Sequence, residues 1–471
     1  MASKPTTPDV QAYDRANQSN ALAAGFLGWT LDAFDFFVLT FVLAPVARDF
    51  HVSLVDVAAT ITGSLAMRPV GAFIFGLMAD RYGRRWPLML DIVFYSVVEV
   101  LSGLAPNYRV FFILRLLYGI GMGGEWGVGA SLAMESVSPK WRGILSGLLQ
   151  EGYAFGNLLA AAVYSLVFPH WGWRAMFFVG GLPALLSLFI FAEVQESPAW
   201  HSSRTDWGTY GRAIARHWKL FLYMVLLMTT MNSISHGTQD LYPTLLQRQR
   251  LFSPRTTAMI TMISMVGAIA GGLLFGLYSD RRGRRRSMVT AVLCALVLIP
   301  AWVLSPTVPL IIVAAFLMQF MVQGAWGVIP VHLNELSPGE LRGFFPGFAY
   351  QLGVLCAASI TLLEALLARH LTYAQSLGWL AGLVLLIGLP VIGLGPEAKG
   401  VAFGKAENGR QKTEGSRRGP EARNFPALRP HRRRRLLPCR RASVLPLGRT
   451  GLLPRGEGVG RRRFLQPSHD G

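Results

Sequence analysis

The chain has 471 residues, of which 52% are hydrophobic and only 15% charged, whereas soluble domains carry roughly a quarter charged residues. The apolar residues run in long unbroken blocks, which excludes a soluble globular protein and indicates a polytopic membrane protein. Three cysteines, two of them inside apolar blocks, exclude a disulfide scaffold and a cysteine-based zinc site. We therefore expect no metal and no cofactor.

Most of the net charge of +19 lies at the C-terminus. Residues 401–471 contain 18 Lys and Arg against 5 Asp and Glu, a net charge of +13. This tail is rich in Arg, Pro and Gly without apolar periodicity, so it predicts a disordered segment and no nucleic-acid interface. It is either a polybasic lipid-binding extension or an aberrant C-terminus. The abrupt change of composition after Gly400 favours the second interpretation, and we assign the tail no function.

Twelve apolar segments are long enough to cross a bilayer as helices. In chain order they are residues 22–47, 54–78, 86–105, 109–134, 144–168, 173–193, 218–242, 256–279, 286–305, 308–332, 343–368 and 374–395. The dense basic connections all follow even-numbered segments and are residues 81–85, 140–142, 204–219 and 281–286. The positive-inside rule then places both termini in the cytoplasm. We expect a multi-pass protein of a cell membrane, the inner membrane of a bacterium.

An internal repeat relates the two halves of the chain at an offset of 200 residues. Residues 76–85 recur as 276–285, both with the pattern G-x-x-x-D-R-x-G-R-R, and residues 135–143 recur loosely as 335–343. Two parallel six-helix halves are a known transporter design with a substrate site at the midplane between them. The predicted parts are a cytoplasmic N-terminus (1–21), a first six-helix bundle (22–193), a cytoplasmic linker (194–217), a second six-helix bundle (218–400) and the basic tail (401–471).

Several motifs resemble those of a known superfamily. The doubled basic motif, with Arg115-x-x-x-Gly119 in the fourth segment, resembles the major facilitator superfamily over residues 20–400. Residues 232–244, N-x-x-S-H-x-T-Q-D-x-x-x-T, are similar to the helix 7 signature of the fungal Jen lactate/pyruvate permeases, which belong to the sialate:proton symporter family. Residues 29–37, W-T-L-D-A-F-D-F-F, are similar to that family's first helix. The resemblance implies an all-α membrane protein with twelve transmembrane helices in two parallel repeats.

Arg68 is the first candidate for substrate binding. It precedes Asp80 by twelve residues, which places it about 18 Å deep at 1.5 Å per residue, near the midplane. Its repeat mate is Ala268, so the charge is not part of the shared scaffold. A guanidinium binds a carboxylate with two parallel hydrogen bonds, and the Jen permeases also carry an arginine in helix 2 implicated in substrate handling. The alternative is a structural ion pair with Asp32, Asp35 or Glu151.

The seventh apolar segment carries a polar stripe. Asn232, His236 and Asp240 are spaced by four residues and share one helix face. His236 titrates near neutrality and Asp240 binds a proton if it is desolvated, as proton symport requires. By the repeat, this stripe faces Asp32 and Asp35 of the first segment. The alternative for His236 is a buried histidine bonded to a backbone carbonyl.

Three further polar residues lie within apolar segments, where each charge is costly and therefore a functional candidate. Glu125 and Glu151 are candidate proton carriers, together with Asp32, Asp35, His236 and Asp240. Gln351, the repeat mate of Glu151, is a candidate substrate ligand. Each of the three has the alternative of hydrogen bonding to neighbouring backbone.

The repeated basic motif predicts a conformational latch, which in the superfamily lies on the cytoplasmic side. Its aspartates pair with arginines at the helix ends, and its glycines permit a sharp turn. The predicted latch residues are Gly76, Asp80, Arg81, Gly83, Arg84, Gly276, Asp280, Arg281, Gly283 and Arg284. The alternative is that these basic residues only fix the orientation in the membrane.

Residues 119–124 match the dinucleotide-binding pattern G-x-G-x-x-G. No strand precedes them, so the context that would confirm a nucleotide site is missing. Small residues allow close approach of helices in a membrane, and we interpret the glycines as helix-packing positions.

These features predict a monomeric transporter rather than an enzyme. The main hypothesis is proton-coupled symport of a small monocarboxylate such as lactate or pyruvate by alternating access. The second is transport of sialic acid or another sugar acid, which would need more hydrogen-bonding groups than this sparse polar set provides. The third, from another class, is a non-transporting membrane sensor.

Overall fold

The computed structural model describes residues 15–401 and residue 403. This part of the chain consists of helices and contains no strand, as the apolar blocks predict. The α-helices are α1 (Arg15–Asp49), α2 (Leu54–Tyr82), α3 (Arg85–Gly103), α4 (Tyr108–Ser136), α5 (Arg142–Gln150), α6 (Gly152–Val179), α7 (Ala184–Glu193), α8 (Pro198–Ser203), α9 (Trp207–Gln239), α10 (Tyr242–Thr244), α11 (Pro254–Arg282), α12 (Arg284–Leu304), α13 (Val308–Trp326), α14 (Ile329–Leu336), α15 (Phe345–Ala357), α16 (Ile360–Leu367) and α17 (Tyr373–Gly393). Leu245–Gln249 forms a π-helical turn and Gly339–Leu341 a 3₁₀ turn.

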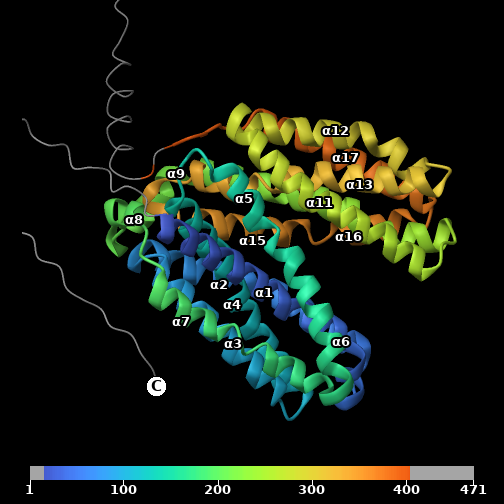
Figure 1. The fold of residues 1–471 in the computed structure, drawn as a ribbon, viewed down its shortest axis with the longest axis horizontal. Coiled ribbons are helices and arrows are strands. Elements are labelled where there is room, and N and C mark those ends of the chain that lie inside the picture. Colours follow the sequence, from blue (N-terminus) through green and yellow to red (C-terminus); the bar gives the residue numbers. More distant parts are fainter. Residues whose placement is uncertain (1–14, 402, 404–471) are drawn as a thin grey trace, which may run out of the picture. The chain divides into compact units, whose positions relative to one another are not determined.

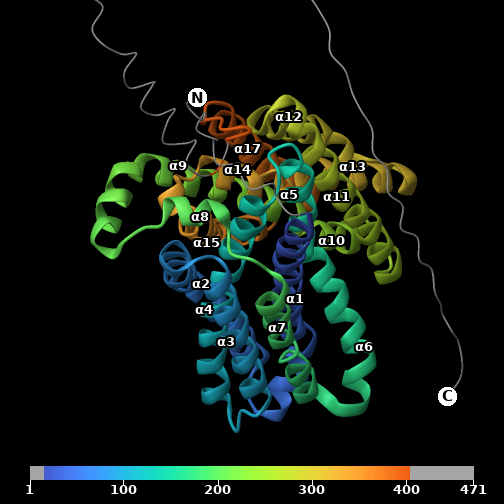
Figure 2. The same cartoon turned by 60° about the vertical axis from the view of Figure 1, so that its left-hand side comes forward.

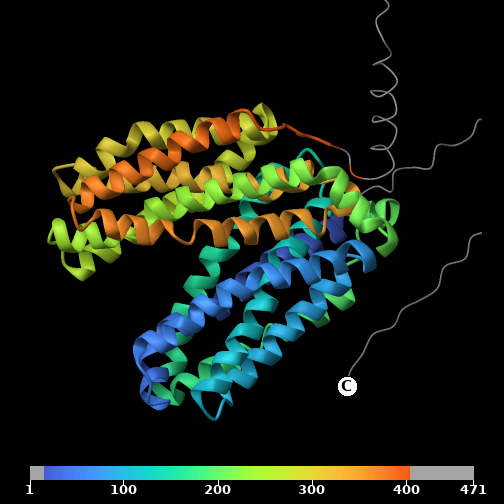
Figure 3. The same cartoon turned by 180° about the vertical axis from the view of Figure 1, so that it is seen from behind.

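The helices of the described residues gather in two groups, which Figure 1 shows in blue to green and in green to orange. We call α1–α7 the first bundle and α9–α17 the second bundle; α8 lies in the connection between them. Both Figure 1 and the reverse view in Figure 3 show the bundles close together at the end near α8 and apart near α6 and α16. We call the first end the basic end, because the arginine clusters of residues 81–85 and 281–286 lie there, and the other the open end.

The outward faces of the helices are apolar. Nine helical stretches in the described residues are long and apolar enough to cross a membrane. Large apolar side chains are exposed on them, including Leu166 (69%), Val297 (73%) and Trp379 (72%). Exposed apolar area of this extent needs a hydrocarbon environment, so the fold agrees with the prediction of a multi-pass membrane protein.

Several predicted spans are not continuous helices. The predicted span 173–193 is divided, because α6 continues through Gly172, whose φ is +71°, to Val179, and α7 begins only at Ala184. Gly180 lies in the gap, and a Cβ atom there would be 2.7 Å from Asp35 Oδ1. The predicted spans 308–332 and 343–368 are likewise interrupted, between α13 and α14 and between α15 and α16. Apolar length alone does not reveal such breaks.

Glycines set the spacing between neighbouring helices. A Cβ atom on Gly123 of α4 would lie 1.9 Å from the carbonyl oxygen of Arg68 in α2, and one on Gly271 of α11 would lie 2.0 Å from that of Phe320 in α13. The glycines of residues 119–124 therefore pack helices, as predicted. Glycines also allow close packing between the two bundles. Helix α5 lies against α11 (Figure 2), and a Cβ on Gly147 would lie 2.4 Å from the carbonyl oxygen of Gly272.

Candidate functional site

Two aspartates of the repeated motif connect the bundles at the basic end. Asp80, near the end of α2, accepts hydrogen bonds from the backbone N–H groups of residues 343 and 344 in the second bundle, at 2.6 and 3.1 Å. Asp280, near the end of α11, accepts the equivalent bonds from residues 143 and 144 in the first bundle, at 2.9 and 3.2 Å. Each bundle thus holds the backbone of the other through a buried carboxylate.

Buried arginines extend these contacts into a charged network. Arg84 donates to Asp80 at 2.7 Å and to Glu135 at 3.0 Å, all within the first bundle. Glu135 also lies 3.7 Å from Arg342 of the second bundle, so one carboxylate links arginines of both bundles. The second repeat forms the same arrangement with Arg284, Asp280, Glu335 and Arg142.

The remaining motif residues serve the turns and the linker. Gly83 and Gly283 have φ values of +103° and +104°, which side chains rarely adopt, so glycine is required there. A Cβ on Gly76 would lie 2.9 Å from Phe344 Cα, so this glycine permits contact between the bundles. Arg81, however, pairs with Asp206 of the linker and not with the second bundle.

Two residues of the second motif, Arg281 and Gly276, make different contacts: one within its own bundle and one with the first bundle. The carbonyl oxygen of Arg281 accepts a hydrogen bond from Lys399 Nζ at 2.9 Å. A Cβ on Gly276 would lie 2.4 Å from the carbonyl oxygen of Gly143 in the first bundle. The aspartates and the first glycine of each motif meet the opposite bundle directly, and Arg84 and Arg284 also lie against its Gly343 and Gly143.

The chain after α17 also contacts this network. The ring of Phe403 lies between two guanidinium groups, with its centroid 3.7 Å from Arg142 Cζ and 3.9 Å from Arg342 Cζ. Arg142 also donates to the carbonyl oxygen of Val401 at 2.7 Å. The first residues of the basic tail thus have a structural contact that the sequence did not predict, while its remaining residues, 402 and 404–471, lie outside the described part of the chain.

A cavity of about 440 Å³ lies between the two bundles. Residues of α1, α2, α5 and α6 line it from the first bundle, and residues of α9, α11, α13 and α15 from the second. Five of the predicted site residues take part in this lining: Arg68, Glu151, Asn232, His236 and Asp240. The structure therefore brings together residues that are up to 172 positions apart in the sequence.

Arg68 is 5% exposed, and its Nε and Nη2 atoms have no hydrogen-bond partner among the described residues. Its guanidinium carbon lies 5.9 Å from the centroid of the Tyr350 ring. The alternative of an ion pair with Asp32, Asp35 or Glu151 is not formed, since no carboxylate of the described residues lies within 4.0 Å of this guanidinium. A buried guanidinium with free donors is able to bind an anion.

The polar stripe of α9 contains a bonded pair. His236 Nδ1 lies 3.0 Å from Asp240 Oδ2, and the hydroxyl of Thr361 donates to the same carboxylate oxygen. Asp240 is exposed, so the pair is accessible to water and to protons. Asn232 also lines the cavity, but its amide nitrogen donates within α9 to the carbonyl oxygen of Met228 at 2.7 Å.

The repeat mates Glu151 and Gln351 have different surroundings. Glu151 lines the cavity, and its Oε1 lies so close to α11 that a Cβ on Gly272 would be 2.3 Å away. Gln351 does not line the cavity; it is 1% exposed and donates to the carbonyl oxygen of Gly123 in α4 at 3.4 Å. This bond is the backbone alternative for Gln351, while its amide oxygen has no partner among the described residues, and its role as a substrate ligand stays a prediction.

Asp32, Asp35 and Glu125 lie inside the first bundle rather than on the cavity wall. All three are fully buried, and their carboxylate oxygens have no hydrogen-bond partner among the described residues. Asp91 of α3 is likewise fully buried, with no hydrogen-bond partner for its carboxylate oxygens among the described residues, and it was not among the predicted site residues. The signal was present, because Asp91 is a charge within the apolar segment 86–105.

Glu99 has a structural partner. Arg115 Nη1 donates to Glu99 Oε1 at 3.1 Å, and Arg115 Nη2 donates to the hydroxyl oxygen of Ser102 at 2.7 Å. Both charged residues are fully buried. A buried pair of this kind is strongly destabilised when one partner is removed.

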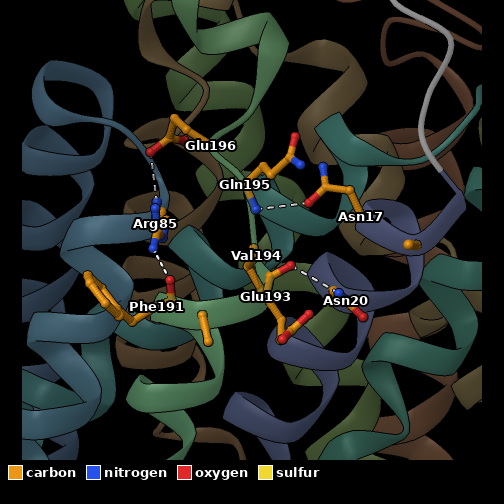
Figure 4. Close-up of a pocket in the computed structure, with 10 residues that line it drawn as sticks. Asn17, Asn20, Arg85, Phe191, Glu193, Val194, Gln195 and Glu196 are labelled. Carbon is orange, nitrogen blue, oxygen red and sulfur yellow. Dashed lines mark hydrogen bonds between the residues drawn. The ribbon is translucent and has the colours of Figure 1, made fainter.

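A second cavity, of about 390 Å³, lies where α1, α3 and the segment after α7 meet (Figure 4). Its polar side chains are engaged with the surrounding backbone: Asn17 accepts from the N–H of Gln195 at 2.9 Å, and Asn20 donates to the carbonyl oxygen of Glu193 at 3.0 Å. Arg85 donates to the carbonyl oxygen of Phe191 (Figure 4). These bonds attach the starts of α1 and α3 to the end of α7 and to the linker that follows it, so this cavity has a structural explanation.

The fold and the shared central cavity agree with a membrane transporter of the major facilitator superfamily. The family described as "Sugar (and other) transporter" matches residues 20–252 and 221–398. The chain belongs to this family.

Similar proteins carry several different names. A "Carboxylic acid transporter protein homolog" of Saccharomyces cerevisiae is 29% identical, and the match covers 74% of this chain. The chain spans only 61% of that protein's length. A "Probable 4-methylmuconolactone transporter" of Cupriavidus pinatubonensis is 30% identical, covering 82% of this chain and 92% of that protein. "Sialic acid transporter NanX" of Escherichia coli is 29% identical, covering 81% and 96%.

Solved structures agree with the fold. The proton:xylose symporter XylE superimposes with a TM-score of 0.67 at 19% identity, over 83% of this chain and 98% of that chain. The human organic anion transporter MFSD10 superimposes with a TM-score of 0.63 at 16% identity, over 80% and 99%. At these identities the likeness concerns the fold.

Proposed function

We propose that this protein is a proton-coupled symporter that carries a small monocarboxylate, such as lactate or pyruvate, across a cell membrane by alternating access. The observation that carries this proposal is the buried guanidinium of Arg68, two of whose nitrogens have no hydrogen-bond partner among the described residues, in a cavity shared by both bundles. An unpaired buried charge is unfavourable, and a substrate carboxylate supplies the missing acceptors. The relative named as a carboxylic acid transporter supports the same substrate class.

In this proposal the basic end and both termini face the cytoplasm. The bundles, residues 22–193 and 218–400, then touch at the cytoplasmic side, and the cavity is reached from outside. The carboxylates Asp80 and Asp280 hold this state, because each bonds the backbone of the opposite bundle. Inward opening breaks these bonds, and one monomer performs the whole cycle.

Protons are carried by groups near the substrate. His236 and Asp240 exchange protons with the open end, where Asp240 is exposed. Asp32, Asp35 and Glu125 lack partners within the first bundle, and Glu151 faces the cavity. Binding of one proton together with one anion leaves the net charge of the cavity unchanged, so the loaded carrier occludes without an added buried charge.

The second candidate is a sialic acid or other sugar-acid permease, which the relative named as a sialic acid transporter supports. It needs donors and acceptors for many hydroxyl groups, and the cavity offers further polar side chains beyond the predicted ones: Gln150, Asn157, Ser235, Gln239 and Gln323. The third candidate, a non-transporting sensor, predicts binding without flux.

Uptake into proteoliposomes tests the proposal. An imposed inward proton gradient is expected to drive accumulation of a labelled monocarboxylate. Arg68→Gln is expected to raise KM at least tenfold, because each hydrogen bond to a charged group contributes about 1.5 to 3 kcal/mol. Arg174→Gln is the matched control, since Arg174 pairs with Asp49 near the surface and does not line the cavity. Equal uptake by the Arg68→Gln variant and the control contradicts the proposal, and saturable binding without uptake supports the sensor.

A further inference from the structure

Aromatic side chains form one part of the wall of the central cavity, beside its polar residues. The aromatic residues that line it are Trp29, Phe36, Phe37, Tyr153, Trp326 and Tyr350. Trp29 and Tyr153 are stacked, with ring centroids 5.4 Å apart and planes at 29°. Tyr350 meets Trp29 and Trp326 edge-on, with centroids at 6.4 and 6.0 Å. Both bundles contribute to this aromatic wall, so a bound molecule contacts rings from two sides.

Unpaired hydrogen-bond donors lie on the same wall. The indole nitrogens of Trp29 and Trp326 are buried and have no hydrogen-bond partner among the described residues. The same is true of two guanidinium nitrogens of Arg68. An indole N–H and a guanidinium donate and do not accept. Buried donors of this kind normally find a partner. A ligand that brings acceptor oxygens therefore completes this site.

The size of the cavity narrows the choice of ligand. A volume of about 440 Å³ falls within the range of roughly 300 to 1,000 Å³ of pockets that enclose drug-sized ligands. A three-carbon acid would bond Arg68 and leave most of the aromatic wall uncovered. A flat ring buries apolar area against these side chains and gains about 0.5 to 1.5 kcal/mol for each well-placed aromatic pair.

We propose that the preferred substrate is a monocarboxylate with a flat unsaturated or aromatic ring. Its carboxylate binds Arg68, its ring packs against Tyr350 and Trp29, and an acceptor oxygen bonds an indole N–H. This inference rests on the proposed function, because it narrows the class of carboxylate that the transporter carries.

A panel of acids in proteoliposomes under an inward proton gradient tests the inference. The probes are benzoate, which has a flat ring; cyclohexanecarboxylate, which has a puckered ring of the same size; and lactate and pyruvate, which have none. Benzoate is expected to be transported with a KM at least tenfold below that of the other three. If lactate or cyclohexanecarboxylate equals benzoate, the inference is wrong while the proposed function stands. If none of the four is transported, the proposed function itself fails.

Variants of one ring separate recognition from folding. Tyr350→Leu is expected to lower the preference for benzoate over lactate at least fivefold, and Tyr350→Phe is expected to keep it because the ring remains. Tyr164→Leu is the matched control, since Tyr164 stacks on Phe41 and Phe168 but does not line the cavity. A ratio of KM values reports on recognition even where the amount of folded protein differs. An unchanged ratio in Tyr350→Leu contradicts the role of the aromatic wall.

Discussion

Replacement of Asp80 by asparagine tests the contact between the bundles. The carboxylate of Asp80 accepts two backbone N–H bonds from the second bundle, at 2.6 and 3.1 Å, and also pairs with Arg84. The amide keeps one acceptor oxygen and loses the charge. A hydrogen bond to a charged group contributes about 1.5 to 3 kcal/mol, so loss of one such bond shifts the equilibrium between closed and open forms of the basic end about 10- to 150-fold towards opening.

Spin labels at the basic end report this shift. Tyr82 and Leu394, which are 50% and 86% exposed, are suitable label sites on the two bundles, after the three native cysteines have been replaced. Distances between the two labels are measured by double electron–electron resonance in lipid nanodiscs. The Asp80→Asn variant is expected to show a larger fraction of long distances than the parent protein does.

The matched control is Asp56→Asn. Asp56 caps the start of α2 through Ser53, is exposed, and makes no contact with the second bundle. The control is expected to keep the parent distance distribution. If Asp80→Asn and Asp56→Asn give the same distribution, Asp80 does not hold the bundles together and the reasoning about the network is refuted.

Three further predictions concern single side chains. Gly272→Ala places a Cβ 2.3 Å from Glu151 Oε1, so Glu151 must move; a several-fold higher KM in uptake assays is expected, and an unchanged KM would exclude a role for Glu151. Phe403→Leu removes a ring that lies between two guanidinium groups, and each of these contacts contributes about 0.5 to 2 kcal/mol. The distances between the spin labels are expected to shift in the same direction as in Asp80→Asn, but by less. Unchanged distances would show that this contact does not hold the bundles together. Glu99→Gln leaves Arg115 without its buried counterion, at a cost of about 3 to 5 kcal/mol; thermal unfolding in detergent is expected to begin at a clearly lower temperature, and an unchanged transition would contradict this pairing.

The sequence predicted the parts of the fold that depend on periodicity. The 200-residue repeat identified the equivalent positions of Asp80 and Asp280, and these two residues make equivalent bonds across the bundles. The depth calculation for Arg68 assumed only helical rise, and the structure does place this residue on the central cavity. Both features follow from local geometry that every helix shares.

Other features depend on which way a helix is turned. Gln351 and Glu151 occupy equivalent positions, yet only Glu151 reaches the cavity, because the two bundles pack their helices differently at this point. Asp32 and Asp35 lie within the first bundle for the same reason. The rotation of a helix about its axis is decided by side-chain packing with its neighbours, which spacing along a single segment does not contain.

The aromatic wall was missed because its residues are ordinary members of apolar segments. Trp29, Tyr153 and Tyr350 belong to three different helices, and aromatic side chains are common in membrane helices and cores. Only the arrangement around Arg68 distinguishes them.

The central claim is that Arg68 binds the carboxylate of the substrate. Isothermal titration calorimetry of the purified protein with pyruvate and with benzoate tests it without the need for transport. The account predicts that Arg68→Gln weakens the binding of whichever acid binds the parent protein by at least tenfold, while Arg174→Gln leaves it unchanged. Parent-like affinity in the Arg68→Gln variant would contradict the account.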